Sequence, residues 1–176
     1  MKAFTLLAFV SAGLCSAGTI TFEEVSLSSG TAVTNQWAAF GITAQNAYFY
    51  VDSRDTFDQR GLSILGTSPG IITFTSAATS LSIDFWVIAG HSGTYSIFDG
   101  THSLLDSFSV TASADALGAH TFSGTGIKTL EYSGDPGFTQ VSTLRFNGST
   151  VPEPSTIGLT LAAFGALAVR RKFARG

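Results

Sequence analysis

The sequence predicts an all-β fold, an antiparallel β-sandwich of the jelly-roll type, in a single domain. The chain has 176 residues, which is enough for one domain. Charged residues make up only 12% of it, against 44% apolar residues, 19 glycines and 15 phenylalanines. This composition is typical of short strands joined by tight turns. Residues 18–148, the expected ectodomain, show alternating apolar positions and no run with the 3.6-residue period of a helix.

Short alternating segments bounded by Gly, Asp or Ser predict the strands. They are residues 19–25, 37–44, 47–51, 71–75, 81–88, 94–98, 103–110, 119–123, 127–132 and 140–146. In the segment 81–88, one face holds a set of apolar side chains that we expect in the core. This set is Leu81, Ile83, Phe85 and Val87.

Three local signals predict the connections between these strands. Asp99-Gly100 indicates a two-residue hairpin turn of type I′. Residues 135–137, Asp-Pro-Gly, indicate a further turn. Leu117 is expected in one short helical turn.

The N-terminus has the pattern of a secretory signal peptide, which we expect to span residues 1–17. Lys2 supplies a positive charge, and an apolar run at 3–14 is too short to span a membrane comfortably. Small residues follow, so we expect cleavage after Ala17. A retained anchor and lipoprotein processing at Cys15 are the alternatives. Because Cys15 is the only cysteine, cleavage after Ala17 would leave a mature chain without disulfides.

The C-terminus divides into three parts. Residues 149–155 form a proline-containing linker, residues 156–169 carry no charge, and residues 170–176 are basic. We expect the middle part to form a short transmembrane helix. Such a helix would reach about 21 Å, less than the ~30 Å of a hydrocarbon core, so the bilayer would have to thin locally. The positive-inside rule predicts a cytoplasmic basic tail.

This arrangement resembles the PEP-CTERM sorting signal of bacterial surface proteins. The resemblance rests on Pro152, Glu153 and Pro154, then the apolar run, and then Arg170, Arg171 and Lys172. It implies that an exosortase, a membrane-embedded protease or transpeptidase, recognises residues 152–154. It also implies export as an inner-membrane precursor, followed by delivery to the outer surface or the exopolysaccharide matrix.

The residues in front of this signal resemble, more loosely, a β-sandwich domain often found there. The landmarks are T-F-E at 21–23, T-N-Q-W at 34–37 and F-D-G at 98–100. Related domains often carry paired aspartates before a final L-x-F, but this chain has Val-Ser-Thr at 141–143. The acids that could complete a calcium site at that end are therefore missing.

No cofactor is expected. The three histidines lack the spacing of a zinc site. The weak calcium candidates are acidic residues near the predicted strand ends, namely Glu23, Asp52, Asp55 and Asp58. Arg54 and Arg60 would neutralise much of that charge.

Exposed aromatic rings are the candidate carbohydrate contacts. Tyr48 and Tyr50 share the face of their predicted strand opposite Phe49, and Trp37 and Trp86 are further candidates. The alternative is that these aromatic side chains belong to the core.

Charge and motifs limit the function. Between residues 18 and 150 there are eleven acidic and four basic residues, so we expect no nucleic-acid partner. G-T-S-P-G at 66–70 matches the hydrolase nucleophile elbow, but Pro69 lacks the N–H that this elbow requires. The main interpretation is a secreted, surface-sorted protein that is not an enzyme. The alternatives are a carbohydrate-binding module that binds matrix polysaccharide and, third, a glycan-active hydrolase.

Overall fold

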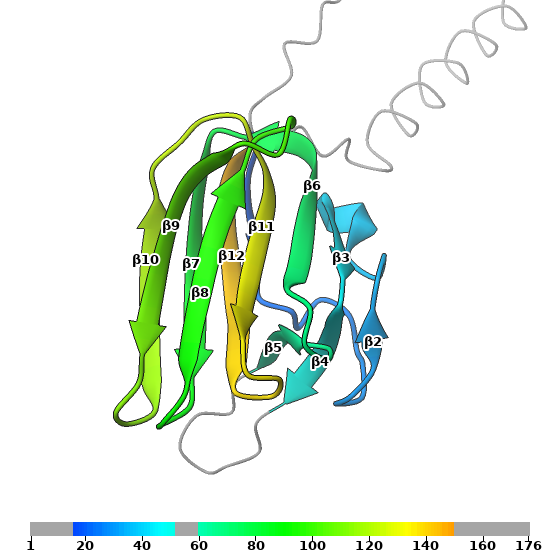
Figure 1. Cartoon of the computed structure of the whole chain (residues 1–176). Coiled ribbons are helices and arrows are strands. Elements are labelled where there is room, and N and C mark those ends of the chain that lie inside the picture. The colour runs from blue at the N-terminus through cyan, green and yellow to red at the C-terminus, as the bar shows by residue number, and fades with distance from the viewer. Residues whose placement is uncertain (1–15, 52–59, 150–176) are drawn as a thin grey trace, which may run out of the picture.

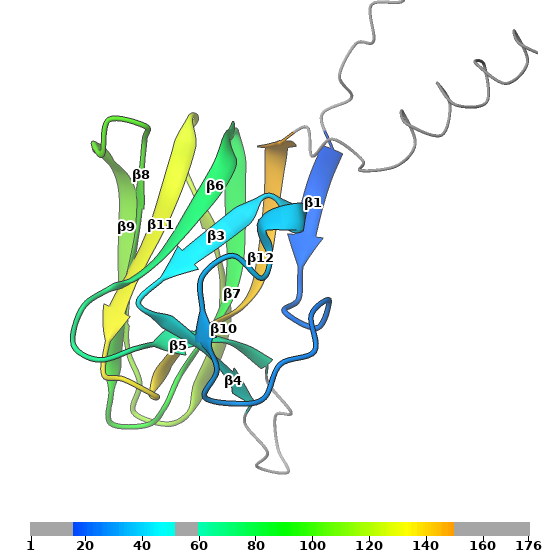
Figure 2. The same ribbon diagram turned by 90° about the vertical axis from the view of Figure 1, so that its right-hand side faces the viewer.

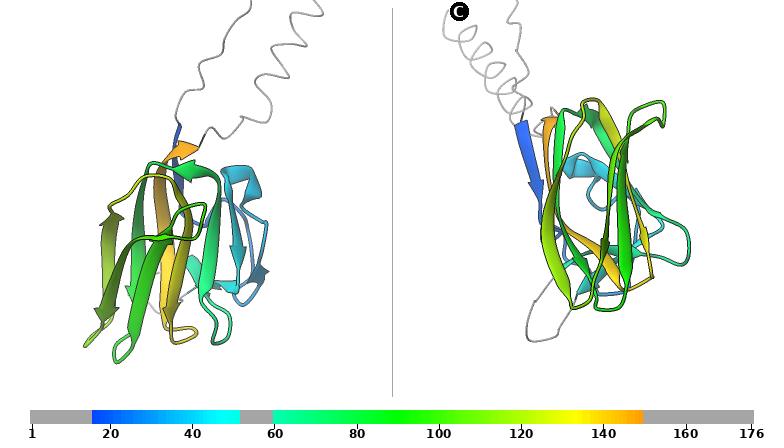
Figure 3. Two further views of the ribbon diagram at one scale, coloured as in Figure 1. Left: turned by 45° about the horizontal axis from the view of Figure 1, so that its top comes forward. Right: turned by 60° about the vertical axis from the view of Figure 1, so that its left-hand side comes forward.

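The computed structural model describes residues 16–51 and 60–149 and contains two antiparallel sheets packed face to face (Figures 1 and 3). Its strands are β1 (Ser16–Ile20), β2 (Ala32–Val33), β3 (Ile42–Gln45), β4 (Ala47–Val51), β5 (Arg60–Ile64), β6 (Gly70–Ala78), β7 (Ser80–Val87), β8 (Ser92–Phe98), β9 (Leu104–Thr111), β10 (Ala116–Phe122), β11 (Ile127–Gly134) and β12 (Thr139–Ser149). A short 3-10 helix, η1 (Ala38–Phe40), precedes β3.

The larger sheet has seven strands in the order β10-β7-β12-β5-β4-β2, with β1 also paired to β12. The smaller sheet has five strands in the order β3-β6-β11-β8-β9. From β6 to β12 the chain passes repeatedly from one sheet to the other, as in a jelly roll. The predicted antiparallel β-sandwich is therefore confirmed.

Both ends of the described domain lie at one end of the sandwich. Ser16, the first residue of β1, pairs with Ser149, the last residue of β12, and Figure 2 shows these strands side by side. The loops 88–91, 112–115 and 135–138 lie at the opposite end, because Val87 pairs with both Ala116 and Thr139. We call this opposite end the distal end.

The core fills the space between the sheets, as the alternation of β7 predicts. The expected inward set is confirmed as buried: Leu81, Ile83, Phe85 and Val87 are between 0% and 8% exposed. The smaller sheet contributes residues that include Ile72, Phe74, Tyr95, Ile97, Leu130 and Tyr132 to the same cluster. One apolar cluster thus joins the two sheets.

The structure corrects several local predictions. The first half of segment 37–44 is not a strand, because Trp37 leads into η1, which ends at Gly41 with φ at +89°. Leu117 lies in β10 and not in a helical turn. β2 and β5 were not predicted.

The connection between β8 and β9 is also longer than the predicted type I′ turn. It runs over residues 99–103, and neither Asp99 nor Gly100 has the positive φ that type I′ requires. The Asp99 carboxylate instead accepts hydrogen bonds from the N–H groups of Thr101 and Ser103, at 2.8 and 2.9 Å. A side-chain acceptor therefore organises this loop.

The expected signal-peptide core, the loop aspartates 52, 55 and 58, and the segments from residue 150 onward lie outside the described residues. Within residues 16–51 and 60–149, no helix has the length and apolar character needed to span a membrane.

Candidate functional site

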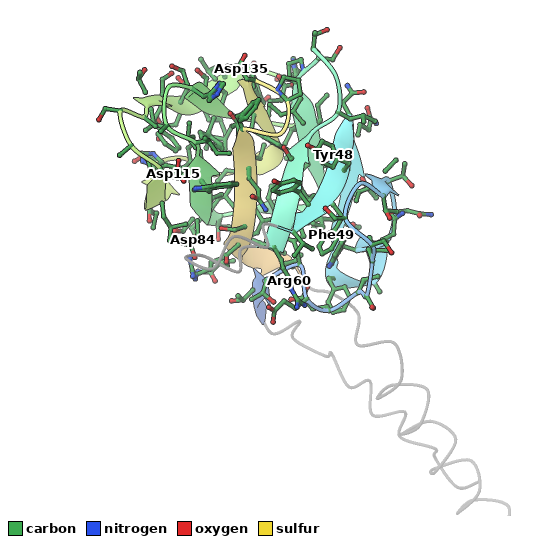
Figure 4. All side chains as sticks on the ribbon, turned by 90° about the horizontal axis from the view of Figure 1, so that it is seen from below. Tyr48, Phe49, Arg60, Asp84, Asp115 and Asp135 are labelled. Atoms are coloured by element: carbon green, nitrogen blue, oxygen red, sulfur yellow. The ribbon has the colours of Figure 1, made fainter. Side chains whose placement is uncertain are left out.

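Tyr48 and Tyr50 lie on the outward face of the larger sheet, on β4. Phe49 between them points into the core and is 2% exposed, which confirms the predicted alternation of this strand. The two tyrosine rings are 6.1 Å apart and nearly perpendicular, at 85°. Both side chains are half-buried, so each keeps part of its ring accessible. Figure 4 shows Tyr48 and Phe49 from the distal end.

Trp86 is not a surface residue, although it lies on the outward face of β7. It is 0% exposed, so the prediction that its ring stacks on a sugar is wrong. Its ring instead lies nearly parallel to that of Tyr50, at a centroid distance of 6.5 Å and an angle of 20°. The strands β5 and β12 separate these residues, and Gly61 stands opposite Tyr50 on β5. The Trp86 ring thereby supports the ring of Tyr50.

The prediction that Trp37 contacts carbohydrate is also wrong, because this residue is only 1% exposed. Its ring meets Phe22 edge-on at 5.2 Å. Its indole N–H donates to a carboxylate oxygen of Glu24 at 3.1 Å, and the other oxygen of Glu24 accepts the N–H of Thr21 at 2.7 Å. The T-F-E and T-N-Q-W landmarks therefore meet in one structural cluster. No local sequence pattern predicts the Trp37–Glu24 hydrogen bond, because the partners are 13 residues apart.

Buried polar groups hold the tyrosine face in place. Ser63 is 0% exposed; its hydroxyl donates to the Thr139 carbonyl at 3.0 Å and accepts the N–H of Gly137 at 3.2 Å. Gln140 is 1% exposed, and its side-chain amide donates to the carbonyl of Tyr50 at 3.4 Å. Neither residue stands out in the sequence, because each occupies an ordinary polar position of an alternating strand.

Two clefts of the described domain have a lining that bears on metal binding and catalysis. One, of about 280 Å³, is lined by Glu23, Ser26 and Arg60 with apolar neighbours. The positive charge of Arg60 disfavours the binding of a metal cation beside Glu23. No group of three metal-ligating side chains occurs within residues 16–51 and 60–149. The other, of about 290 Å³, is lined by Arg145 with neutral side chains from β1, β7, β10 and β12. Neither cleft brings two carboxylates together.

The described carboxylates with shifted pKa values favour ionisation. The side-chain hydrogen bond from Arg145 is the main cause of the lowered pKa of Asp84, and burial opposes it. Arg145 forms a bidentate pair with Asp84 at 2.7 and 2.6 Å. The pKa values of Glu24 and Asp99 are lowered too. A general acid of a glycosidase needs the opposite shift, a raised pKa.

Comparison with known proteins adds one assignment. Residues 150–172 match the model of the PEP-CTERM protein-sorting motif. The chain carries a PEP-CTERM sorting signal. It is therefore an exported protein that an exosortase processes, as the resemblance of the C-terminal segment predicted, and it is sorted through a membrane-anchored precursor.

The comparison of the sequence with curated proteins gave no match. Among solved structures, similarity was found to a carbohydrate-binding module of Cellvibrio mixtus lichenase 5A in complex with cellotriose. The identity is 11% and the TM-score 0.38, over 61% of this chain and 90% of that one. A family 6 carbohydrate-binding module is 16% identical with a TM-score of 0.39, and the similarity covers 75% of this chain and 94% of that one.

The enzymatically active domain of tailspike protein 4 from bacteriophage CBA120 is 12% identical with a TM-score of 0.29. The similarity covers 76% of this chain and 18% of that one. TM-scores in this range lie below the level at which two chains share a fold. The fold assignment of this chain therefore rests on its own strand order and core.

Proposed function

We propose that the domain of this PEP-CTERM protein is a non-catalytic module that binds polysaccharide of the cell surface or exopolysaccharide matrix through Tyr48 and Tyr50. One observation carries the proposal: two partly accessible tyrosine rings lie on the outward face of a sheet, and Trp86 supports one of them. Amphipathic rings suit sugars, because the apolar ring face packs on C–H groups while the hydroxyl forms hydrogen bonds. Because the rings are held in place, binding loses little conformational entropy.

The charge and the clefts support the non-catalytic part of the proposal. Paired carboxylates are absent from the two clefts, and the Arg145 pair holds Asp84 in its ionised form. A neutral polysaccharide is the best-suited ligand, since the polar side chains that hold the tyrosine face, Ser63 and Gln140, are buried and uncharged.

The processing steps form the second part of the proposal. A signal peptide at 1–17 is removed, a helix at 156–169 holds the precursor in the inner membrane, and the basic tail at 170–176 stays cytoplasmic. The exosortase then recognises residues 152–154 and releases the domain to the surface or matrix. Because β12 ends at Ser149, the distal end points away from the point of attachment.

Binding to the producing cell's own exopolysaccharide tests the ligand. The mature protein is measured by isothermal titration calorimetry and on a glycan array, with Tyr48→Ala and Tyr50→Ala as variants. Each variant should bind at least about tenfold more weakly, as expected for a central aromatic contact. Phe98→Ala is the matched control, because Phe98 is a half-buried aromatic residue of the smaller sheet. Unchanged affinity in both tyrosine variants would refute the site.

A further inference from the structure

We propose that His91, Asp135 and Phe138 form a second sugar subsite at the distal end, so that the domain binds a chain of sugar residues rather than a single one. This inference rests on the proposed polysaccharide binding and extends it to a second surface. We call these three residues the distal rim. They come from two loops, 88–91 and 135–138, that connect different strand pairs.

The two rings of the distal rim are stacked. His91 and Phe138 lie with their centroids 4.0 Å apart and their planes within 4° of parallel. His91 Nδ1 lies 2.6 Å from a carboxylate oxygen of Asp135. The imidazole is therefore held from one side by the carboxylate and packed on one face by the phenyl ring.

Backbone hydrogen bonds fix both loops. The N–H of Phe138 donates to the carbonyl of Asp135 at 3.1 Å, and Gly137 has φ at +80°, as residue i+2 of a type II turn requires. This confirms the turn predicted at 135–137. The N–H of Ile88 donates to the carbonyl of Phe138 at 3.0 Å, which ties the two loops together.

The distal rim combines an apolar surface with polar groups, as a sugar requires. Phe138 is 39% exposed although it is a large apolar residue. The Asp135 side chain is 61% exposed and the His91 side chain 28%. A sugar could place its C–H face on Phe138 and its hydroxyls against the carboxylate and the imidazole. Figure 4 labels Asp135 in the view of the molecule from below.

The rim is continuous with the tyrosine face. A Cβ on Gly137 would lie 3.2 Å from the hydroxyl oxygen of Tyr48, so that tyrosine reaches the loop that carries Phe138. Ser63, which lies between β4 and β12 on the same face, accepts the N–H of Gly137. One ligand chain can thus run from Tyr48 over the loop 135–138 to the rim.

Affinity as a function of ligand length tests the subsite. The probe is the producing cell's exopolysaccharide, partly hydrolysed by acid and separated by size, titrated into the mature protein. Wild type should gain at least about tenfold in affinity from short to longer fractions. Phe138→Ala should bind short fractions like wild type and lose that gain, and Phe138→Trp should keep it. Tyr50→Ala should weaken binding at every length.

A matched control exists at the other end of the sandwich. Phe98 stacks on His102 with centroids 4.5 Å apart and planes within 6°, and Glu131 lies 3.6 Å from that histidine. Phe98→Ala should leave the length dependence intact. If Phe138→Ala keeps the full gain, the subsite is refuted and the tyrosine site stands. If wild type binds no fraction at all, the proposed function fails as well.

Discussion

The packing of Phe85 against Gly118 gives a sharp test of the core. The Phe85 ring reaches from β7 to the smaller sheet, where it lies 5.4 Å from the ring of Tyr95 and 5.2 Å from that of Phe108. Gly118 is its partner across the β7–β10 pair. A Cβ placed on Gly118 would lie 2.7 Å from Cζ of Phe85, which is closer than atoms in contact can approach.

Three variants follow from this geometry. Phe85→Ala should lower the free energy of unfolding by about 3–5 kcal/mol, because it leaves a cavity between the sheets. Gly118→Ala alone should cost about 1–3 kcal/mol by overpacking. In the Phe85→Ala background the obstructing ring is gone, so the added methyl should cost nothing or stabilise slightly, by up to ~1 kcal/mol. The two substitutions should therefore couple by at least about 1 kcal/mol.

Denaturant and thermal unfolding of the mature protein provide the measurement. A domain of this size has a free energy of unfolding of roughly 5–15 kcal/mol, so Phe85→Ala should show a clearly lowered melting temperature. Additive effects in the double variant would show that Gly118 and Phe85 do not meet as described. A Phe85→Ala melting temperature within a degree or two of wild type would refute the inward orientation itself.

Three further predictions concern charge and sorting. Burial raises the pKa of Glu24, but its hydrogen bonds lower that pKa by more, so the net shift is downward. The ionised carboxylate therefore stabilises the fold fully above the ordinary pKa of Glu, and this stabilisation is lost as the pH falls through the lowered pKa. Glu24→Gln should remove this contribution, so that the melting temperature falls less steeply in acid. Asp84→Asn, which weakens the Arg145 pair, should cost at most about 1 kcal/mol at neutral pH and less in acid, as denaturant midpoints would show. Alanines at 152–154 should leave an uncut membrane precursor. Neutralising 170–172 should let uncut protein pass through the membrane or invert in it. Fractionation and mass spectrometry in hosts with and without the exosortase measure both effects, and identical processing in the two hosts would contradict recognition by an exosortase.

Much of the fold could be predicted because alternation directly reports a sheet with one buried face. The segment 47–51 coincides with β4, and 81–88 nearly coincides with β7. The segment 37–44 failed because its apolar residues serve a tertiary purpose: Trp37 packs on Phe22 before the chain makes a turn of 3-10 helix. A two-residue strand such as β2 carries too little pattern to be recognised.

The site was only partly predictable for a similar reason. Alternation placed Tyr48 and Tyr50 on one face, but it could not show that Trp86, also on the outward side, is covered. Burial on the outer face of a sheet depends on residues far away in the sequence, here Tyr50 across two intervening strands. The distal rim was missed because His91 and Phe138 are 47 positions apart and meet only through the strand order.

The strand order also explains how a domain can be trimmed at both ends and remain folded. The last described strand, β12, ends at Ser149, and the matched sorting motif begins at residue 150, so a cut within the motif removes no described strand. Cleavage after Ala17 would remove the first two residues of β1, but residues 18–20 would keep their pairing with 144–146 of β12. Since β12 is also held by β7 and β5, the strand that leads to the membrane anchor lies inside the sheet. The proposed cut after Ser149 therefore leaves every described strand in the released domain, and the proposed distal rim lies at the opposite end of the sandwich.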